Sequence, residues 1–277
     1  MRAWGLVGGS RRMIHDEVAP AVAARWRGRF AIGSPIRRIT IVSAADATHG
    51  ASLANLAASV QRHAPTADFV AWDLGLELRQ VERLKAAHPK VRIRPFPFAQ
   101  EPQHMDVRHQ AGHYAWKPVI IEHEAAGDPA RLLLWLDAGD LVVGSLDVLA
   151  RVIARDGLYS PHSSGRIVDW THPLMLERFN VSIAHRTAAN LSGGIVGADP
   201  AMAGVRDLLA AWARCARDAA CIAPAGSDRS NHRQDQSSLS ILARQAGFAL
   251  DRPYHRSFGW AGIAIHRDVD HVGTIRR

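Results

Sequence analysis

Short apolar runs alternate with stretches of helical spacing between residues 39 and 94. The apolar runs are rich in β-branched or aromatic residues and predict buried strands at 39–42, 69–72 and 91–94. The stretches between them carry apolar residues at the spacing of amphipathic helices, at 51–63 and 76–88. This β-α-β-α-β order is how a doubly wound α/β sheet begins, and such sheets bind ligands at the carboxyl ends of their strands.

The remainder of the chain continues this pattern less regularly. Residues 95–112 are rich in Pro, His and Gln and predict a long functional loop. The run 131–136 is the best candidate for the central buried strand, and 190–198 predicts a further strand with a glycine pair at its start. Further helices are expected at 114–126, 146–154, 200–217 and up to about residue 245. We expect an N-terminal arm over residues 1–35 and a single domain over residues 36–277.

Composition indicates an ordered α/β protein and argues against nucleic acid as a partner. Of 277 residues, 47% are hydrophobic and 22% are charged, which suffices for a large core. The net charge is +8, yet only three of the 34 Lys and Arg residues are lysines. Basic residues are scattered and form no cluster interleaved with aromatics, so a coding bias toward arginine explains the charge better than nucleic-acid binding. A phosphate-bearing substrate would still gain from the positive field.

Cysteine usage and hydropathy predict a cytoplasmic protein. Cys215 and Cys221 form no CxxC pair and are expected to be free thiols in a reducing compartment. No apolar run has the length of a membrane span, and residues 1–30 lack the apolar region of a signal peptide. Residues 19–30 could form a short basic helix, which leaves peripheral membrane association open.

The most informative motif is acidic and follows the central apolar run. Asp137 and Asp140 flank an Ala-Gly pair, and a four-residue turn brings its ends within about 7 Å. Two such carboxylates repel each other unless a cation lies between them, and Mg²⁺ or Mn²⁺ prefers hard oxygen ligands that it shares with substrate phosphates. The alternative is an ordinary turn in which Asp137 caps the following segment.

Two other patterns carry polar or conformationally special residues. Gly193 and Gly194, after Asn190, permit close backbone approach to a ligand, or form a bend needed for packing. Asp235 and Gln236 precede an apolar helix, where they could hydrogen-bond sugar hydroxyls or where Asp235 could cap the helix.

A lysine and the late histidines complete the candidates. Lys117 follows two aromatics and could neutralise a phosphate, or lie at a helix start with buried rings. Among 15 histidines, His255 and His266 come late enough in the chain to supply a third metal ligand, although each taken singly is more simply a surface or core residue.

Taken in order, these pieces resemble the GT-A glycosyltransferases, and most closely the superfamily around glycosyltransferase family 8. The resemblance rests on the first strand at 39–42, the acidic motif after 132–136, the Asn-containing glycine strand at 190–194, and Asp235-Gln236. It implies a GT-A fold, with a Rossmann-like, mostly parallel central sheet covered by helices on both faces.

The resemblance also implies roles for individual residues. Ser43 and Ala44 would line the nucleoside pocket, while Asp137 and Asp140 would hold the metal and the diphosphate, with His266 as the late histidine ligand. Gly193 and Gly194 would line the sugar and acceptor cleft, and Asp235 and Gln236 would act on the donor sugar or acceptor. Lys117 and Asn190 complete the expected donor site.

The chain departs from the family pattern in two places. Its acidic motif is Asp-x-x-Asp in place of Asp-x-Asp, and Arg267 stands beside His266 where the family has a lysine. The expected activity is transfer of a sugar from a nucleotide-diphosphate donor to a glycan or small hydroxyl acceptor, assisted by Mn²⁺ or Mg²⁺. The alternative is a non-catalytic nucleotide- or glycan-binding module with the same fold. No GxSxG or HExxH motif indicates a serine or zinc hydrolase.

Overall fold

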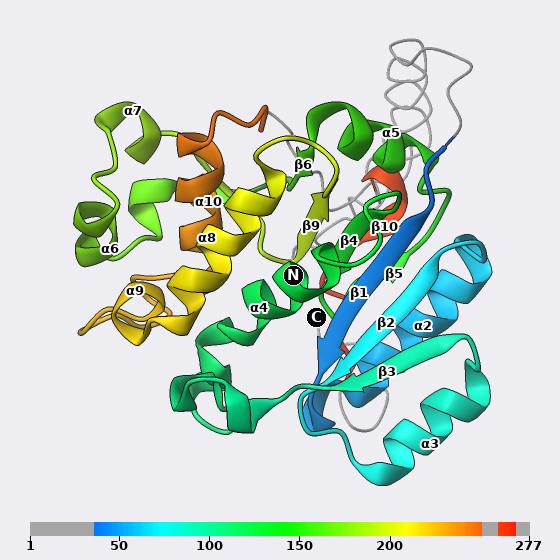
Figure 1. Ribbon diagram of the computed structural model, residues 1–277. Helices are drawn as coiled ribbons and strands as arrows, with labels where there is room; N and C mark the ends of the chain where they lie inside the picture. The colour runs from blue at the N-terminus through cyan, green and yellow to red at the C-terminus, as the bar shows by residue number, and fades with distance from the viewer. Residues whose placement is uncertain (1–35, 251–259, 270–277) are drawn as a thin grey trace, which may run out of the picture.

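A central sheet of six strands organises the protein (Figure 1). The computed structural model describes residues 36–250 and 260–269; the predicted N-terminal arm and His255 lie outside these ranges. The strand order is β3-β2-β1-β4-β9-β6. The bounds are β1 (Ile39–Ala45), β2 (Asp68–Asp73), β3 (Val91–Pro95), β4 (Leu132–Leu136), β6 (Leu158–Tyr159) and β9 (Ile195–Ala198).

Strand direction in this sheet is mostly parallel, as expected. β1 pairs in parallel with both β2 and β4, so that Ile41 lies opposite Phe69 on one side and Leu134 on the other. β2 and β3 are also parallel, whereas β9 runs antiparallel to β4 and to β6. All five residues of β4 are buried, which agrees with its uninterrupted apolar sequence.

Helices cover both faces of the sheet, because successive strand residues point in opposite directions. Ile41 and Leu134 belong to a core shared with α2 (Gly50–His63), α3 (Leu78–Ala87) and α5 (Asp147–Asp156). Val42 and Trp135 belong to a second core shared with α4, α8 and α10. The three helices of this second core are α4 (Trp116–Ala125), α8 (Val205–Arg217) and α10 (Gln234–Gln245). The predicted GT-A-type layering, with helices on both faces, is confirmed.

Shorter elements connect these layers. β5 (Leu141–Val142) pairs with β10 (Ile263–Ala264), and β7 (His162–Arg166) pairs with β8 (Ala189–Leu191), both antiparallel. The short helices are α6 (Pro173–Arg178), α7 (Ile183–Arg186) and α9 (Ala219–Ile222). Single 3₁₀ turns are η1 (Ala47–His49), η2 (Phe98–Gln100), η3 (Gln103–Met105), η4 (Gln110–Tyr114), η5 (Ile167–Asp169) and η7 (Trp260–Gly262).

The predicted strand over residues 190–198 is wrong, since it divides into β8 and β9 in two different sheets. Ser192, Gly193 and Gly194 form the turn between them, and the backbone N–H of Gly194 donates to the Ser192 hydroxyl at 3.3 Å. Apolar residues stand on both sides of this turn, at Leu191 and at Ile195-Val196, and glycines also occur within strands, so the sequence does not mark the division.

The prediction of free thiols is also wrong, because Cys215 and Cys221 form a disulfide. The bond joins the end of α8 to α9. The Asp218 carboxylate accepts from the Ala220 N–H and caps α9. A separation of six residues carries no motif signal, so the sequence does not show that the end of α8 and the start of α9 bring the two sulfurs together. The predicted cytoplasmic location stays a prediction.

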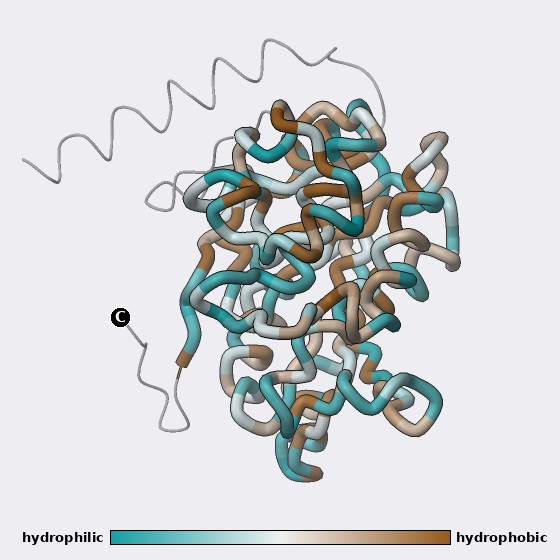
Figure 2. The backbone as a smooth tube through the Cα atoms, turned by 90° about the vertical axis from the view of Figure 1, so that its left-hand side faces the viewer, coloured by the Kyte–Doolittle hydropathy of each residue, from teal (hydrophilic) through white to brown (hydrophobic). Residues whose placement is uncertain are grey.

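Hydrophobic and hydrophilic segments alternate at short intervals along the backbone (Figure 2). None of the helices in the described ranges is long and apolar enough to cross a membrane.

Candidate functional site

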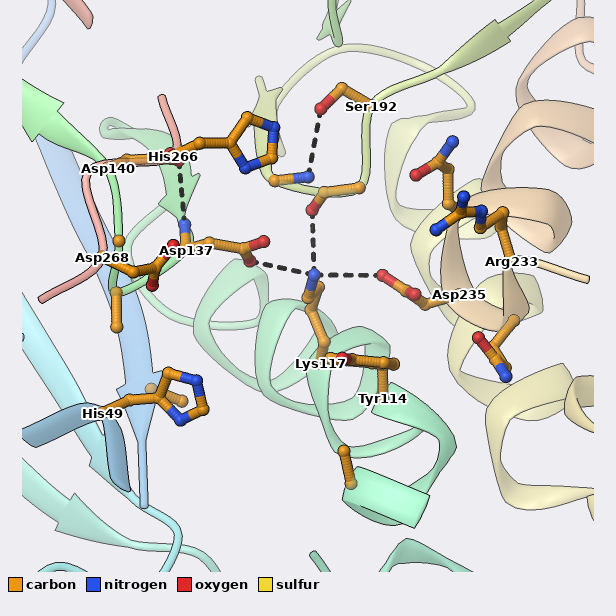
Figure 3. Close-up of a pocket in the computed structure, with 18 of the residues that line it drawn as sticks. His49, Tyr114, Lys117, Asp137, Asp140, Ser192, Arg233, Asp235, His266 and Asp268 are labelled. Atoms are coloured by element: carbon orange, nitrogen blue, oxygen red, sulfur yellow. Dashed lines mark hydrogen bonds and ion pairs between the residues drawn. The ribbon is translucent and has the colours of Figure 1, made fainter. Parts of the chain in front are cut away.

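A pocket of about 410 Å³ opens at the carboxyl ends of β1 and β4. Its walls come from segments far apart in the sequence: the end of β1, the turn after β4, the turn between β8 and β9, the starts of α4 and α10, and residues 265–268 (Figure 3). This is the edge at which doubly wound sheets bind ligands.

The acidic motif forms a closed turn on this edge. The Asp140 N–H donates to the Asp137 carbonyl at 2.9 Å, and the Asp137 N–H donates both to the Asp140 carboxylate at 3.2 Å and to the Gly194 carbonyl at 3.0 Å. The cap of this turn is therefore Asp140, which leaves the Asp137 side chain 45% exposed on the pocket wall.

A third carboxylate lies against the same turn. The Arg267 N–H donates to the Gly139 carbonyl at 2.6 Å, which draws residues 266–268 onto the motif. The Asp268 carboxylate occupies the space that a Cβ atom on residue 139 would fill, so any larger residue there would displace Asp268. The extra residue of the Asp-x-x-Asp motif therefore lies inside the hydrogen-bonded turn of residues 137–140, which packs against Asp268.

Asp140 is buried, and its surroundings disfavour the charged form of its carboxyl group. Its burial, together with the negative charge of Asp137, raises the pKa of Asp140 well above its ordinary value. The backbone N–H of His266 and the ammonium of Lys117 act in the opposite direction. A positive charge beside Asp137 and Asp140 would therefore be strongly favoured.

Lys117 joins two other carboxylates at the centre of the pocket wall. Its Nζ lies 2.9 Å from Asp137 Oδ1 and 3.1 Å from Asp235 Oδ2, and it donates a hydrogen bond to the Gly193 carbonyl at 3.1 Å (Figure 3). The Lys117 side chain is only 4% exposed. Burial disfavours its charged form, but the attraction of Asp137 and Asp235 outweighs this and raises the pKa of Lys117. The ammonium stays charged and faces three protein oxygens.

Asp235 is buried in the first turn of α10. Its carboxylate does not cap that helix, because the N-cap residue is Arg233 and no side chain accepts there. Burial raises the pKa of Asp235, while the attraction of Lys117 lowers it in part. A Cβ on residue 193 would lie 2.8 Å from Asp235 Oδ2, so Gly193 is what permits this close approach. Asp235 Oδ2 is ion-paired with Lys117 yet accepts no hydrogen bond in good geometry.

Most of the residues predicted for the site line this one pocket. They are Ala44, Lys117, Asp137, Asp140, Gly193, Gly194, Asp235, Gln236 and His266. Ser43 and Asn190 do not line it, which corrects their expected place in the donor site. Ser43 is fully buried because the alternation along β1 turns it away from Ala44, and the Asn190 side chain accepts from the Ser240 hydroxyl at 2.7 Å.

The predicted metal ligands share the pocket without forming a closed cage. Asp137, Asp140 and His266 all line it, but no group of three or more His, Cys, Asp or Glu residues within 36–250 and 260–269 is gathered for metal binding. His266 approaches Asp140 through its backbone N–H.

Several lining residues were not foreseen from the sequence. They are Asp46, His49, Trp170, Arg229, Arg233 and Asp268. Asp268 and Arg233 each lie two residues from a predicted site residue, and this proximity is the one signal that could have found them. Trp170 is the C-cap residue of η5, in a segment that carries no sequence motif.

Comparison with known proteins was made on sequence and on structure. A family model described as "Protein of unknown function (DUF1647)" matches residues 34–122. A search of curated proteins gave no match. Among solved structures, the apo WbbM bifunctional glycosyltransferase aligns with a TM-score of 0.50 and 15% identity, over 76% of this chain and 39% of that chain. This chain therefore spans less than half of the WbbM structure.

Two further solved structures align at comparable coverage. An active-site mutant of LgtC has a TM-score of 0.49 and 19% identity, over 73% of this chain and 69% of that chain. Core-mannan synthase A from Aspergillus fumigatus, in a Mn/GDP form, has a TM-score of 0.46 and 10% identity, over 77% of this chain and 71% of that chain. At these identities the likeness concerns the fold alone. The chain has the GT-A fold of glycosyltransferases.

Proposed function

We propose that this protein is a glycosyltransferase that moves a sugar from a nucleotide-diphosphate donor to a hydroxyl group of a glycan or small molecule. The observation that carries the proposal is the acidic turn of Asp137 and Asp140 on the wall of the pocket, at the carboxyl ends of the strands. The GT-A fold supports it, because the turn occupies the edge where doubly wound sheets bind ligands.

A divalent cation fits the residues at this turn. Mg²⁺ and similar ions are commonly held by one or two carboxylates together with substrate phosphates, so a cage made only of protein groups is not needed. Asp137 and Asp140 offer such carboxylates, and a cation beside them would lower the pKa of Asp140, which burial and the charge of Asp137 raise. Asp268 and His266 line the same part of the pocket. A bound Mn²⁺ or Mg²⁺ would supply Lewis-acid stabilisation of the departing diphosphate.

The protein groups beside this turn would bind and orient the donor sugar. The Asp235 carboxylate lines the pocket beside the acidic turn, with Lys117 Nζ 3.1 Å from its Oδ2, and it would accept a hydrogen bond from a sugar hydroxyl there. Lys117 favours the ionised form of Asp235 and fixes this carboxylate relative to Asp137. Gln236 adds an amide to the same wall. Lys117 therefore acts by positioning two carboxylates, in place of the direct phosphate contact expected from the sequence.

A non-catalytic module with the same fold is the second candidate function. The departure of the acidic motif from Asp-x-Asp favours it, because a second acidic residue in the wrong place would weaken metal binding. In the structure, Asp140 caps its own turn, and this is the observation behind the alternative. The two candidates differ in whether a bound donor is turned over.

The donor site is tested by thermal unfolding with nucleoside diphosphates, each with and without Mn²⁺. A ligand that binds only the folded state stabilises it by about 2.7 kcal/mol at one hundred times its Kd. We expect one diphosphate to raise the unfolding temperature strongly with Mn²⁺ and weakly without it. If no nucleotide raises the unfolding temperature under either condition, the proposed function is wrong.

A further inference from the structure

Two arginines line the pocket beyond Lys117 and Asp235. Arg233 is the N-cap residue of α10, and Arg229 lies four residues earlier. In Figure 3, Lys117 lies between Arg233 on one side and Asp140 and Asp268 on the other. Negative and positive side chains therefore gather at different ends of the pocket. The carboxylates of the acidic turn lie at one end, and the two guanidinium groups lie near the start of α10 at the other.

Aromatic rings hold both guanidinium groups in place. The Arg233 Cζ lies 4.2 Å from the centroid of the Trp170 ring, and the backbone N–H of Arg233 donates to the Trp170 carbonyl at 3.0 Å, which fixes the two residues beside each other. The Arg229 Cζ lies 5.5 Å from the centroid of the Tyr114 ring, and its Nη1 donates to the Tyr114 hydroxyl at 2.5 Å. Stacking on aromatic faces orients an arginine while leaving its edge donors available.

Neither arginine forms an ion pair with a carboxylate of the described residues. Many other arginines in the same ranges do, among them Arg37, Arg131, Arg166, Arg178 and Arg217. Two guanidinium groups that lack a counter-charge and share a pocket wall favour an anion in that pocket. Carboxylate and phosphate oxygens match the fork of N–H groups on arginine. The N-terminus of the 12-residue helix α10 adds a positive partial charge at the same place.

We propose that Arg229 and Arg233 bind an anionic group, a carboxylate or a phosphate, on the sugar acceptor. This inference rests on the proposed function, which places the donor diphosphate at the acidic turn and the donor sugar at Asp235 and Gln236, so that the acceptor would lie beyond them, beside Arg229 and Arg233. Ser163, Ser164 and Trp170 line the same side and offer hydroxyls and a ring face to a sugar. The acceptor class is thus an acidic sugar, such as a uronic acid or a sugar phosphate, in preference to a neutral one.

The test measures binding of glucuronate, glucose 6-phosphate and neutral glucose to the full-length protein by saturation-transfer NMR at low salt. We expect saturable binding of at least one acidic sugar and at least about ten-fold weaker binding of glucose. The comparison of glucuronate with glucose 6-phosphate decides between carboxylate and phosphate. Inorganic phosphate is titrated as a competitor, since it should displace the acidic sugar from the same arginines.

The double variant Arg229→Gln/Arg233→Gln should lose at least about ten-fold in affinity for the acidic sugar. Arg62→Gln/Arg214→Gln is the matched control, because both arginines are exposed outside the pocket and their loss removes the same two charges. Equal binding of glucose and acidic sugars, or a double variant that binds like the control, would overturn the proposal.

A separate readout distinguishes this site from the donor site. Stabilisation by the nucleoside diphosphate with Mn²⁺ is measured on the same double variant. A loss of that stabilisation equal to the loss of acidic-sugar binding would mean that the arginines hold the donor phosphates, and would overturn the assignment to the acceptor. If the wild-type protein binds acidic sugars but no nucleotide, the proposed function fails while the arginine site stands.

Discussion

Replacing Asp137 with asparagine is expected to lower the rate of sugar transfer by about 10²–10³-fold while the protein stays folded. Asparagine keeps the shape of the side chain and its oxygen can still accept from the Trp135 Nε1, which donates to Asp137 at 2.8 Å. The substitution removes the one carboxylate of the acidic turn that is substantially exposed to the pocket. The loss should therefore fall on binding of the cation and on stabilisation of the leaving diphosphate.

Two measurements check this prediction. Donor turnover is compared between wild type, Asp137→Asn and Glu82→Gln, the last being exposed on α3 and removing one negative charge away from the pocket. Nucleotide stabilisation with Mn²⁺ is followed in parallel, and it should fall in Asp137→Asn but not in Glu82→Gln. Wild-type turnover in Asp137→Asn would exclude the acidic turn from catalysis.

Replacing Lys117 with methionine is expected to lower the free energy of unfolding by about 3–5 kcal/mol at pH 8, the cost of leaving a buried charge unpaired. Most of this cost comes from Asp235, whose side chain is 7% exposed. Asp137 is 45% exposed, so water replaces much of what Lys117 provides to it. The free energy of unfolding is obtained from urea denaturation.

The loss in Lys117→Met should be smaller at pH 5 than at pH 8. Burial already raises the pKa of Asp235 in the folded protein, and removal of Lys117 takes away the attraction that lowers it. A carboxyl group whose pKa is higher in the folded state binds more protons there than in the unfolded state. The free energy of unfolding therefore falls as the pH rises from the ordinary carboxyl pKa through the raised one.

The double variant Lys117→Met/Asp235→Asn is the control for this effect. Removing both charges should recover most of the stability and reduce the difference between pH 5 and pH 8. The part that remains should come from Asp140, whose raised pKa Lys117 also lowers. A loss that is the same at both pH values, or a double variant as unstable as Lys117→Met, would contradict the assignment of the buried ion pair.

The parts of the fold that were predictable are those governed by local periodicity. β1, β2, β3 and β4 all appear where apolar alternation or an apolar run predicts a strand. The turn after β4 was predictable because a glycine and two aspartates follow a fully apolar strand. The split of residues 190–198 was not, since β8 and β9 differ only in which sheet they join.

The site was less predictable, because its contacts join distant segments. The sequence marks Lys117 and Asp235 separately, but only the packing of α4 and α10 on the same face of the sheet brings them within 3.1 Å. Arg233 and Trp170 are likewise joined by the backbone hydrogen bond between η5's C-cap and α10. Such pairings depend on tertiary packing, which leaves no periodic signal in the sequence.

The measurement that tests the central claim most directly is release of nucleoside diphosphate from a panel of nucleotide sugars, with and without Mn²⁺. The proposed function predicts slow release from one donor, strict dependence on the cation, and acceleration when an acceptor sugar is added. Tight binding of a nucleotide sugar with no release under any of these conditions would contradict it and would identify the protein as a binding module with a glycosyltransferase fold.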